Sequence, residues 1–158
     1  MSNSIEEQIE RIRTYPARLE AVVRDLSEQD LTTPYLDGEW TVAQNVHHVA
    51  DSHLNAYMRF KLFLLEENSV AKPYDQDVWA TTADSMSPDM SATFILLNGI
   101  HARWVALMES LSDEEWTHTG GYTSGRVITL VQFLDVYAKH GDDHIDQIQR
   151  TLAAKPDA

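Results

Sequence analysis

The sequence predicts an all-α protein, an antiparallel four-helix bundle that forms a single domain over residues 1–158. Four stretches carry apolar residues at steps of three and four, which is the period of an amphipathic helix. Nearly all glycines and prolines lie between these stretches, and no long strand pattern separates them. A chain of about 150 residues is long enough for one buried core. Helices without intervening strands pack as a bundle.

The first two helices are predicted over residues 4–26 and 41–65. Pro16 lies within the first and should kink or split it, because proline lacks the N–H of a helix interior. The second begins at a capping-box pattern, in which Thr41 precedes Gln44 by three residues. Its apolar residues cover more than one face, which would suit a dimer interface.

A polar segment without a clear period follows over residues 68–89, and segments of this length are usually functional. The third helix is predicted over residues 90–111. Three glycines at positions 120, 121 and 125 then indicate a turn-rich segment with a short hairpin. The last helix begins near Thr129, where the capping-box pattern recurs, and continues to about residue 152.

The charge balance is 12 basic against 25 acidic residues, a net charge of −13. Such a surface repels phosphate backbones and anionic lipids, so neither nucleic acid nor a membrane is an expected partner. The longest uncharged apolar run covers residues 90–102, which is short of the roughly twenty residues of a membrane span, and no signal peptide is expected. The absence of cysteine fits a cytoplasmic location and restricts any metal site to imidazole and oxygen ligands.

Two histidines stand four residues apart in the last helix, in the motif His140-Gly-Asp-Asp-His144. Residues at this spacing share a helix face, so both rings can reach one ion. The motif is explained equally well by two exposed histidines on an acidic helix that bind no metal. The metalloprotease motif is excluded, because Gly141 stands where that motif needs glutamate. Either Asp142 or Asp143 could orient a ligand imidazole.

The second helix adds His47, His48 and His53. Adjacent residues diverge by about 100 degrees around a helix, so His47 and His48 cannot both bind the same ion. Periodicity alone favours His53, at the centre of the apolar stripe, although a lone histidine there is usually a hydrogen-bonded core residue. His101 and His118 lack a partner at ligand spacing and are expected to be structural or solvated.

Five segments together resemble the DinB/YfiT-like superfamily, and within it the YfiT branch, whose members are named as metal-dependent hydrolases. The resemblance extends over residues 31–148 in consistent order. The segments are Trp40-Thr-Val-Ala-Gln-Asn-Val-His-His-Val-Ala-Asp-Ser-His53, Arg59-Phe-Lys-Leu62, Pro73-Tyr-Asp75, His101-Ala-Arg-Trp104 and Tyr137-Ala-Lys-His-Gly-Asp-Asp-His144.

This resemblance implies a four-helix bundle, often dimeric, with a divalent metal (Zn or Ni) on three histidines. One ligand follows a Trp-x7-His pattern with a small apolar pair behind it, and this pattern selects His48 after Trp40. The other two come from the His-x3-His pair, His140 and His144. The resemblance therefore favours His48 over His53, with His47 as the nearest alternative.

Two enzymatic functions stay open, together with a non-catalytic bundle that binds metal or a partner protein. Related branches imply a thiol S-transferase, in which the metal activates bacillithiol, mycothiol or glutathione for attack on a small-molecule substrate. The branch name implies a hydrolase that uses metal-bound hydroxide. Hydrolysis requires a general base beside the metal-bound water. None of the candidates has a diagnostic spacing, namely Asp51, Asp142, Asp143 and the unused histidines. Thiol transfer is therefore ranked ahead of hydrolysis.

A thiol of this class carries carboxylates, which a chain of charge −13 must hold with placed cations. The candidates are Arg59, Arg103 and Arg126, although each is more often a surface or ion-pair residue. A homodimer is the expected assembly.

Overall fold

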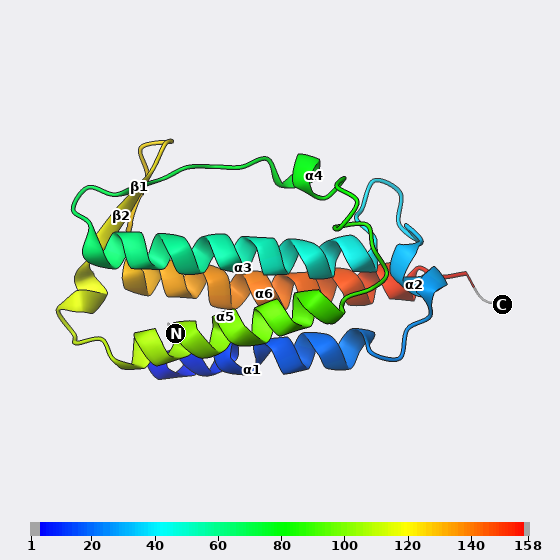
Figure 1. Cartoon of the computed structure of the whole chain (residues 1–158), viewed down its shortest axis with the longest axis horizontal. Coiled ribbons are helices and arrows are strands. Elements are labelled where there is room, and N and C mark those ends of the chain that lie inside the picture. Colours follow the sequence, from blue (N-terminus) through cyan, green and yellow to red (C-terminus); the bar gives the residue numbers. More distant parts are fainter. Residues whose placement is uncertain (1–3, 157–158) are drawn as a thin grey trace.

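The computed structural model describes residues 4–156 and contains four long helices (Figure 1). They are α1 (Ile5–Val23), α3 (Val42–Leu65), α5 (Ser91–Glu109) and α6 (Leu130–Ala153). Both α1 and α3 pack against α5 and against α6, so α1 lies diagonally opposite α3. The predicted all-α four-helix bundle is confirmed. Within the described residues, none of the helices has the length and apolarity that crossing a membrane requires.

The bundle is not a simple up-and-down arrangement. Figure 1 shows α1 and α6 running in one direction, whereas α3 and α5 run in the other. The antiparallel neighbours are therefore α1 with α5 and α3 with α6, while α3 and α5 are parallel. A parallel pair needs a long return connection. Segment 66–90 provides it, because the 24 residues of α3 measure only about 36 Å.

This return connection is attached to the rest of the fold near its start and again in its middle. Its first part contains β1 (Val70–Ala71), which pairs in parallel with β2 (Thr119–Tyr122), and β2 forms a hairpin with β3 (Val127–Thr129). This hairpin confirms the predicted turn-rich segment. Further along lies α4 (Gln76–Trp79), after which the side-chain amide of Gln44 donates to the carbonyl oxygen of Ala80 at 2.9 Å.

Helix starts agree with the sequence where a side-chain cap exists. Thr41 and Thr129 each form the predicted capping box, with Gln44 and Gln132. Helix α1 is continuous through Pro16, so of the two predicted outcomes, a kink or a split, the split is wrong, and the proline is buried within the bundle. The short elements α2 (Glu28–Thr32), β1, α4 and a 3-10 turn (Glu115–Thr117) were not predicted, because they are too short to show a period.

Two apolar clusters fill the bundle, and a layer of histidines lies where they meet. One cluster surrounds Phe60, Trp104 and Phe133, and the other contains Tyr15 and Leu19. The ring of His53 contacts Trp104 of the first cluster and Tyr15 of the second. The long helices thus bring polar rings from α3, α5 and α6 together in the middle of an otherwise apolar interior.

Candidate metal centre

Three histidines from two helices converge at one side of this layer. His48 of α3 and the pair His140 and His144 of α6 each place a ring nitrogen within 4.8 Å of the others. The Nε2 atoms of His140 and His144 are 3.2 Å apart, as expected for residues on successive turns of one helix. Within residues 4–156, no other histidine or carboxylate joins this group.

The hydrogen bonds of His144 determine which of its nitrogens is free. Its Nδ1 lies 2.8 Å from Oδ1 of Asn45, whose own amide group donates to the carbonyl oxygen of Thr41 at 3.0 Å. Because the Asn45 oxygen can only accept, Nδ1 of His144 carries the proton. Nε2 of the neutral ring is then an acceptor with a free lone pair.

His140 is oriented through a line of two further histidines. Nδ1 of His140 is 3.3 Å from Nε2 of His53, and Nδ1 of His53 is 2.8 Å from Nε2 of His101. Nδ1 of His101 lies 2.6 Å from the carbonyl oxygen of Ile12. A carbonyl only accepts, so in neutral rings every Nδ1 along this line donates. Nε2 of His140 is left as an acceptor.

This donor set fits a cation. The Nε2 lone pairs of His140 and His144 face each other, which is unfavourable unless a positive charge lies between them. Nε2 of His48 is buried and has no hydrogen-bond partner among the described residues. A buried polar atom without a partner costs free energy. Imidazole nitrogens of this kind are common ligands of zinc and nickel.

Burial keeps these rings in the form that binds metal. Desolvation, together with the charge of neighbouring histidines at His48 and His140, lowers the pKa of His48 to about 4, of His140 to about 3 and of His144 to about 4. The three rings are therefore neutral at pH 7. Neutral imidazole is the ligating species, because protonation occupies the lone pair.

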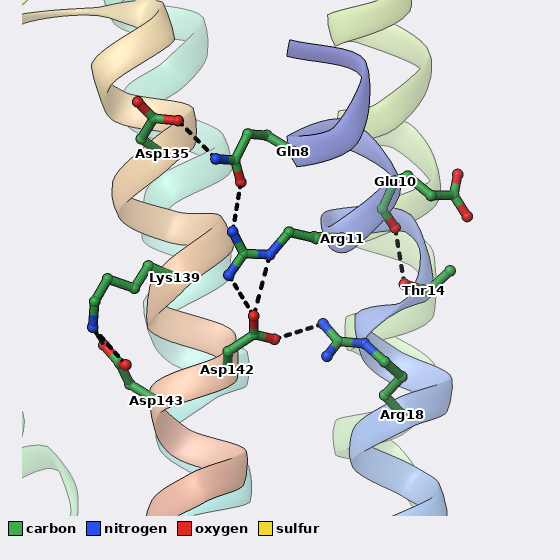
Figure 2. A network of polar contacts seen from close by, with 9 residues as sticks. All are labelled: Gln8, Glu10, Arg11, Thr14, Arg18, Asp135, Lys139, Asp142 and Asp143. Atoms are coloured by element: carbon green, nitrogen blue, oxygen red, sulfur yellow. Dashed lines mark hydrogen bonds and ion pairs between the residues drawn. The ribbon is translucent and has the colours of Figure 1, made fainter. Parts of the chain in front are cut away.

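The opposite face of the same helical turn is packed against α1 (Figure 2). Asp142 forms ion pairs with Arg11 and Arg18, and Asp143 pairs with Lys139. The expectation that one of these aspartates orients a ligand imidazole is wrong, since Nδ1 of His144 is bonded to Asn45 and Nδ1 of His140 to His53. A Cβ atom at Gly141 would lie 2.6 Å from the Tyr15 ring, so the glutamate of a metalloprotease could not stand there.

The remaining histidines lie where they cannot join the group directly. His47 contacts Oγ1 of Thr93 at 2.7 Å and the carbonyl oxygen of Ser87 at 2.9 Å, so the nearest alternative to His48 faces away. His118 contacts the Leu64 carbonyl oxygen, at the far end of α3. His53, which periodicity favoured, and His101, which the sequence left without a role, form the line behind His140.

Two cavities open onto the histidine group from different sides, and Gln76 of α4 lines both. The cavity beside His140 has a volume of about 300 Å³ and is lined by Arg59 and three tyrosines, with no acidic residue. The cavity beside His144 has a volume of about 230 Å³ and is lined by Glu39 and Asp77, with no basic residue. The structure places Asp51, a candidate general base, in a separate pocket with His47 and Asp84.

Known proteins resemble this chain over most of its length. The profile of the DinB superfamily matches residues 11–148. The "Putative metal-dependent hydrolase YfiT" of Bacillus subtilis is 42% identical over 142 residues, covering 89% of this chain and 79% of the relative. A Halalkalibacterium halodurans protein with the same functional name is 39% identical over 144 residues, covering 91% and 84%.

Solved structures resemble it as well. The structure of YfiT from Bacillus subtilis, described as having "an unusual four-helix bundle topology", superposes with a TM-score of 0.90 at 39% identity, covering 95% of this chain and 88% of that one. A mycothiol-dependent maleylpyruvate isomerase has a TM-score of 0.69 at 16% identity, covering 91% and 60%. This second similarity concerns the fold alone.

Proposed function

Because the chain belongs to the DinB superfamily, we propose that it is a metal-dependent enzyme whose divalent cation, zinc or nickel, is held by His48, His140 and His144. One observation carries the proposal: three neutral ring nitrogens from two helices converge, and two of them are fixed as acceptors by their hydrogen bonds. Three ligands without a fourth are typical of catalytic rather than structural sites.

The cation would supply Lewis acidity, which makes a water or a thiol acidic enough to serve as a nucleophile near neutral pH. The protein's own groups prepare the place for it. Asn45 orients His144 through a hydrogen bond, and the ring of Trp40 stacks on His144 at a centroid distance of 6.4 Å. Trp40 also packs against His48 and so limits solvent access to two of the three rings.

Thiol S-transfer is the reaction we place first, because two separate cavities adjoin the site and a transfer joins two reactants. The acidic cavity, with Glu39 and Asp77, suits a reactant that carries an ammonium group. Low-molecular-weight thiols such as bacillithiol, mycothiol or glutathione are the candidate cofactors. Because such a thiol carries carboxylates, it would enter the cavity beside His140, which Arg59 lines, and the second reactant would enter the acidic cavity.

Hydrolysis is the second candidate function, and two observations favour it. Glu39 and Asp77 line the cavity that contains His144, so a carboxylate is available as general base. The relative at 42% identity is named as a hydrolase. In either reaction the substrate would be a small molecule, and the predicted homodimer is a separate proposal that sedimentation of the purified protein would test.

Metal content and two activity assays separate these functions. We expect about one zinc or nickel ion per purified chain, with metal and activity both lost in His144→Ala and both retained in the control His118→Ala, which removes a histidine remote from the site. Conjugation of thiols to an aryl halide would identify a transferase, and cleavage of a p-nitrophenyl ester a hydrolase. Bound metal without either activity would favour a binding protein, and wild-type protein that binds no divalent metal would contradict the proposal.

A further inference from the structure

The line of histidines behind His140 begins at a proline. In a regular helix the N–H of residue 16 would donate to the carbonyl oxygen of Ile12, but Pro16 has no N–H. The Ile12 oxygen therefore lacks its helix partner, and Nδ1 of His101 occupies it at 2.6 Å. The residue that should have broken α1 instead supplies a free acceptor at the centre of the bundle.

We propose that Pro16, Ile12, His101 and His53 form a positioning device that holds His140 in the tautomer with Nε2 free for a cation. This inference rests on the proposed metal site. The Ile12 carbonyl can only accept, so it sets the direction of each hydrogen bond in turn: His101 donates to Ile12, His53 to His101, and His140 to His53. The carbonyl oxygen of Ile12 in α1 therefore determines which tautomer His140 adopts.

Burial makes this device difficult to replace by water. The side chain of His53 is 0% exposed and that of His101 is 1% exposed. Tyr15, Trp104 and Tyr137 pack against the ring of His53, so solvent does not reach this part of the line. Hydrogen-bond partners behind a metal-binding histidine typically change metal affinity by about 10- to 100-fold. His53 is therefore a positioning residue and not a fourth ligand.

His53→Leu removes the acceptor, and His53→Gln retains a side chain with one donor and one acceptor. We expect the leucine variant to bind zinc about 10- to 100-fold more weakly in competition with a chelator, and the glutamine variant to bind nearer to wild type. His47→Leu is the matched control, since it removes a buried, hydrogen-bonded histidine of the same helix that lies outside the line. Its zinc affinity should equal that of wild type.

Two tests do not depend on a destabilised variant. Proton–nitrogen NMR spectra of wild-type, metal-free protein should show His140 protonated at Nδ1, and protonation at Nε2 would overturn the inference. Pro16→Ala returns an N–H that competes for the carbonyl oxygen of Ile12, so His140 should become a mixture of tautomers.

Equal zinc affinity in wild type and His53→Leu would also overturn the inference. If wild type binds no zinc, the proposed function fails, while the NMR tautomer still decides this inference.

A second inference comes from the cavity beside His140 and the state of Arg59. The half-buried guanidinium of Arg59 donates to the Lys72 carbonyl oxygen at 2.6 Å and lies 5.8 Å from the ring centre of Tyr74. Among the ion pairs of residues 4–156, none includes Arg59. The cavity lining itself contains no acidic residue, so Arg59 reaches the cavity wall without a carboxylate partner there.

We infer that this cavity binds a small-molecule substrate through a carboxylate, and this too rests on the proposed function. Its lining contains one permanent charge, that of Arg59, and neutral donors in Tyr74, Tyr122, Tyr137 and Gln76. One positive charge with several hydroxyl donors complements a monoanion, and guanidinium matches the geometry of a carboxylate. His140 lines the same cavity, so the bound molecule would lie next to the proposed cation.

Benzoate and benzamide are suitable probes, since they differ mainly in charge. In NMR titrations of the Arg59 and Gln76 side chains, we expect benzoate to bind wild type about tenfold more tightly than benzamide, because hydrogen bonds to charged groups are stronger. Arg59→Gln should abolish this preference. Arg103→Gln should keep it, since Arg103 also lies against a tyrosine ring, that of Tyr57, but outside the cavity.

The titrations are run with zinc and without metal, so that they remain informative if the protein binds no metal. Equal binding of benzoate and benzamide by wild type would overturn the assignment, as would an unchanged preference in Arg59→Gln. Inorganic phosphate that displaces benzoate at equal concentration would indicate a general anion site and would overturn the carboxylate assignment.

Discussion

One turn of α6 presents two different surfaces. Toward α3 it places His140 and His144, neutral rings whose Nε2 atoms have no donor opposite them. Toward α1 it places Gly141 and Asp142, one in close contact with Tyr15 and the other in ion pairs with two arginines (Figure 2). The contrast shows that charge pairing and tight packing fix the helix on one side, while unpaired acceptors lie on the side that lines the two cavities.

If the acceptor side is a cation site, its occupancy should have a large effect on stability at neutral pH. At a zinc concentration 100 times the dissociation constant, we expect the free energy of unfolding to rise by about 2.7 kcal/mol. Urea denaturation with and without zinc measures the rise. His140→Ala should remove most of it, whereas His118→Ala should not. An equal rise in all three proteins would mean that zinc binds elsewhere.

The packed side is tested by adding one carbon atom. Gly141→Ala would place Cβ 2.6 Å from the ring of Tyr15, so α1 and α6 must separate slightly, and we expect a loss of about 1–3 kcal/mol in the free energy of unfolding. Gly99→Ala is the matched control, because α5 has open space there. That change should be neutral or stabilise the protein by up to about 1 kcal/mol. A loss of equal size at both positions would contradict the packing argument.

The two sides should also respond to pH in different ranges. The three grouped histidines have a lowered pKa in the folded protein, so the unfolded chain binds protons first, and stability of the metal-free protein should fall as pH decreases from 6.5 toward 4. The expected slope is about 1.4 kcal/mol per pH unit for each proton taken up. A flat profile over this range in urea denaturation would show that the rings are not buried as neutral groups.

Asp142 should contribute only at lower pH. Burial raises its pKa, but hydrogen bonds with Arg11 and Arg18 outweigh burial and leave the pKa below 3.8. Its stabilisation is present above pH 3.8 and is lost as pH falls further. Asp142→Asn should therefore change the profile below this value while keeping the histidine region between pH 6.5 and 4.

The smallest effect is expected for a single arginine of the packed side. Arg18 is 41% exposed, and Arg11 continues to hold Asp142 without it. Arg18→Gln should therefore lower the free energy of unfolding by about 0.5 kcal/mol and leave zinc affinity unchanged. Thermal unfolding and chelator competition measure the two quantities. A large loss of zinc affinity would show that the two sides are coupled more strongly than their contacts indicate.

Features that depend on neighbours along the chain could be predicted from the sequence. The capping boxes at Thr41 and Thr129 are local, and both helices start where these residues indicate. The shared face of His140 and His144 follows from their spacing in the same way. The parallel course of α3 and α5 could not be predicted, because it depends on how segment 66–90 returns along the bundle.

The choice between His48 and His53 shows where periodicity reaches its limit. Both side chains are buried, at 4% and 0% exposed, and a helical wheel reports burial rather than the partner on the next helix. Nδ1 of His53 is hydrogen-bonded to His101, which is 48 residues away. His101 is in turn hydrogen-bonded to the Ile12 carbonyl oxygen, which Pro16 leaves without its helix partner. No spacing rule connects these residues. The resemblance to a family favoured His48 through the sequence pattern that starts at Trp40. Burial along one helix could not distinguish the two histidines.

The return connection between α3 and α5 has a consequence for how such proteins diversify. It contributes Gln76 to both cavities yet supplies none of the three grouped histidines, and it is attached at β1 and again at Ala80. Insertions or substitutions between these two attachments would reshape both entrances without moving the helices. Evolution could in this way change which molecules the two cavities accept while the three histidines stay in place.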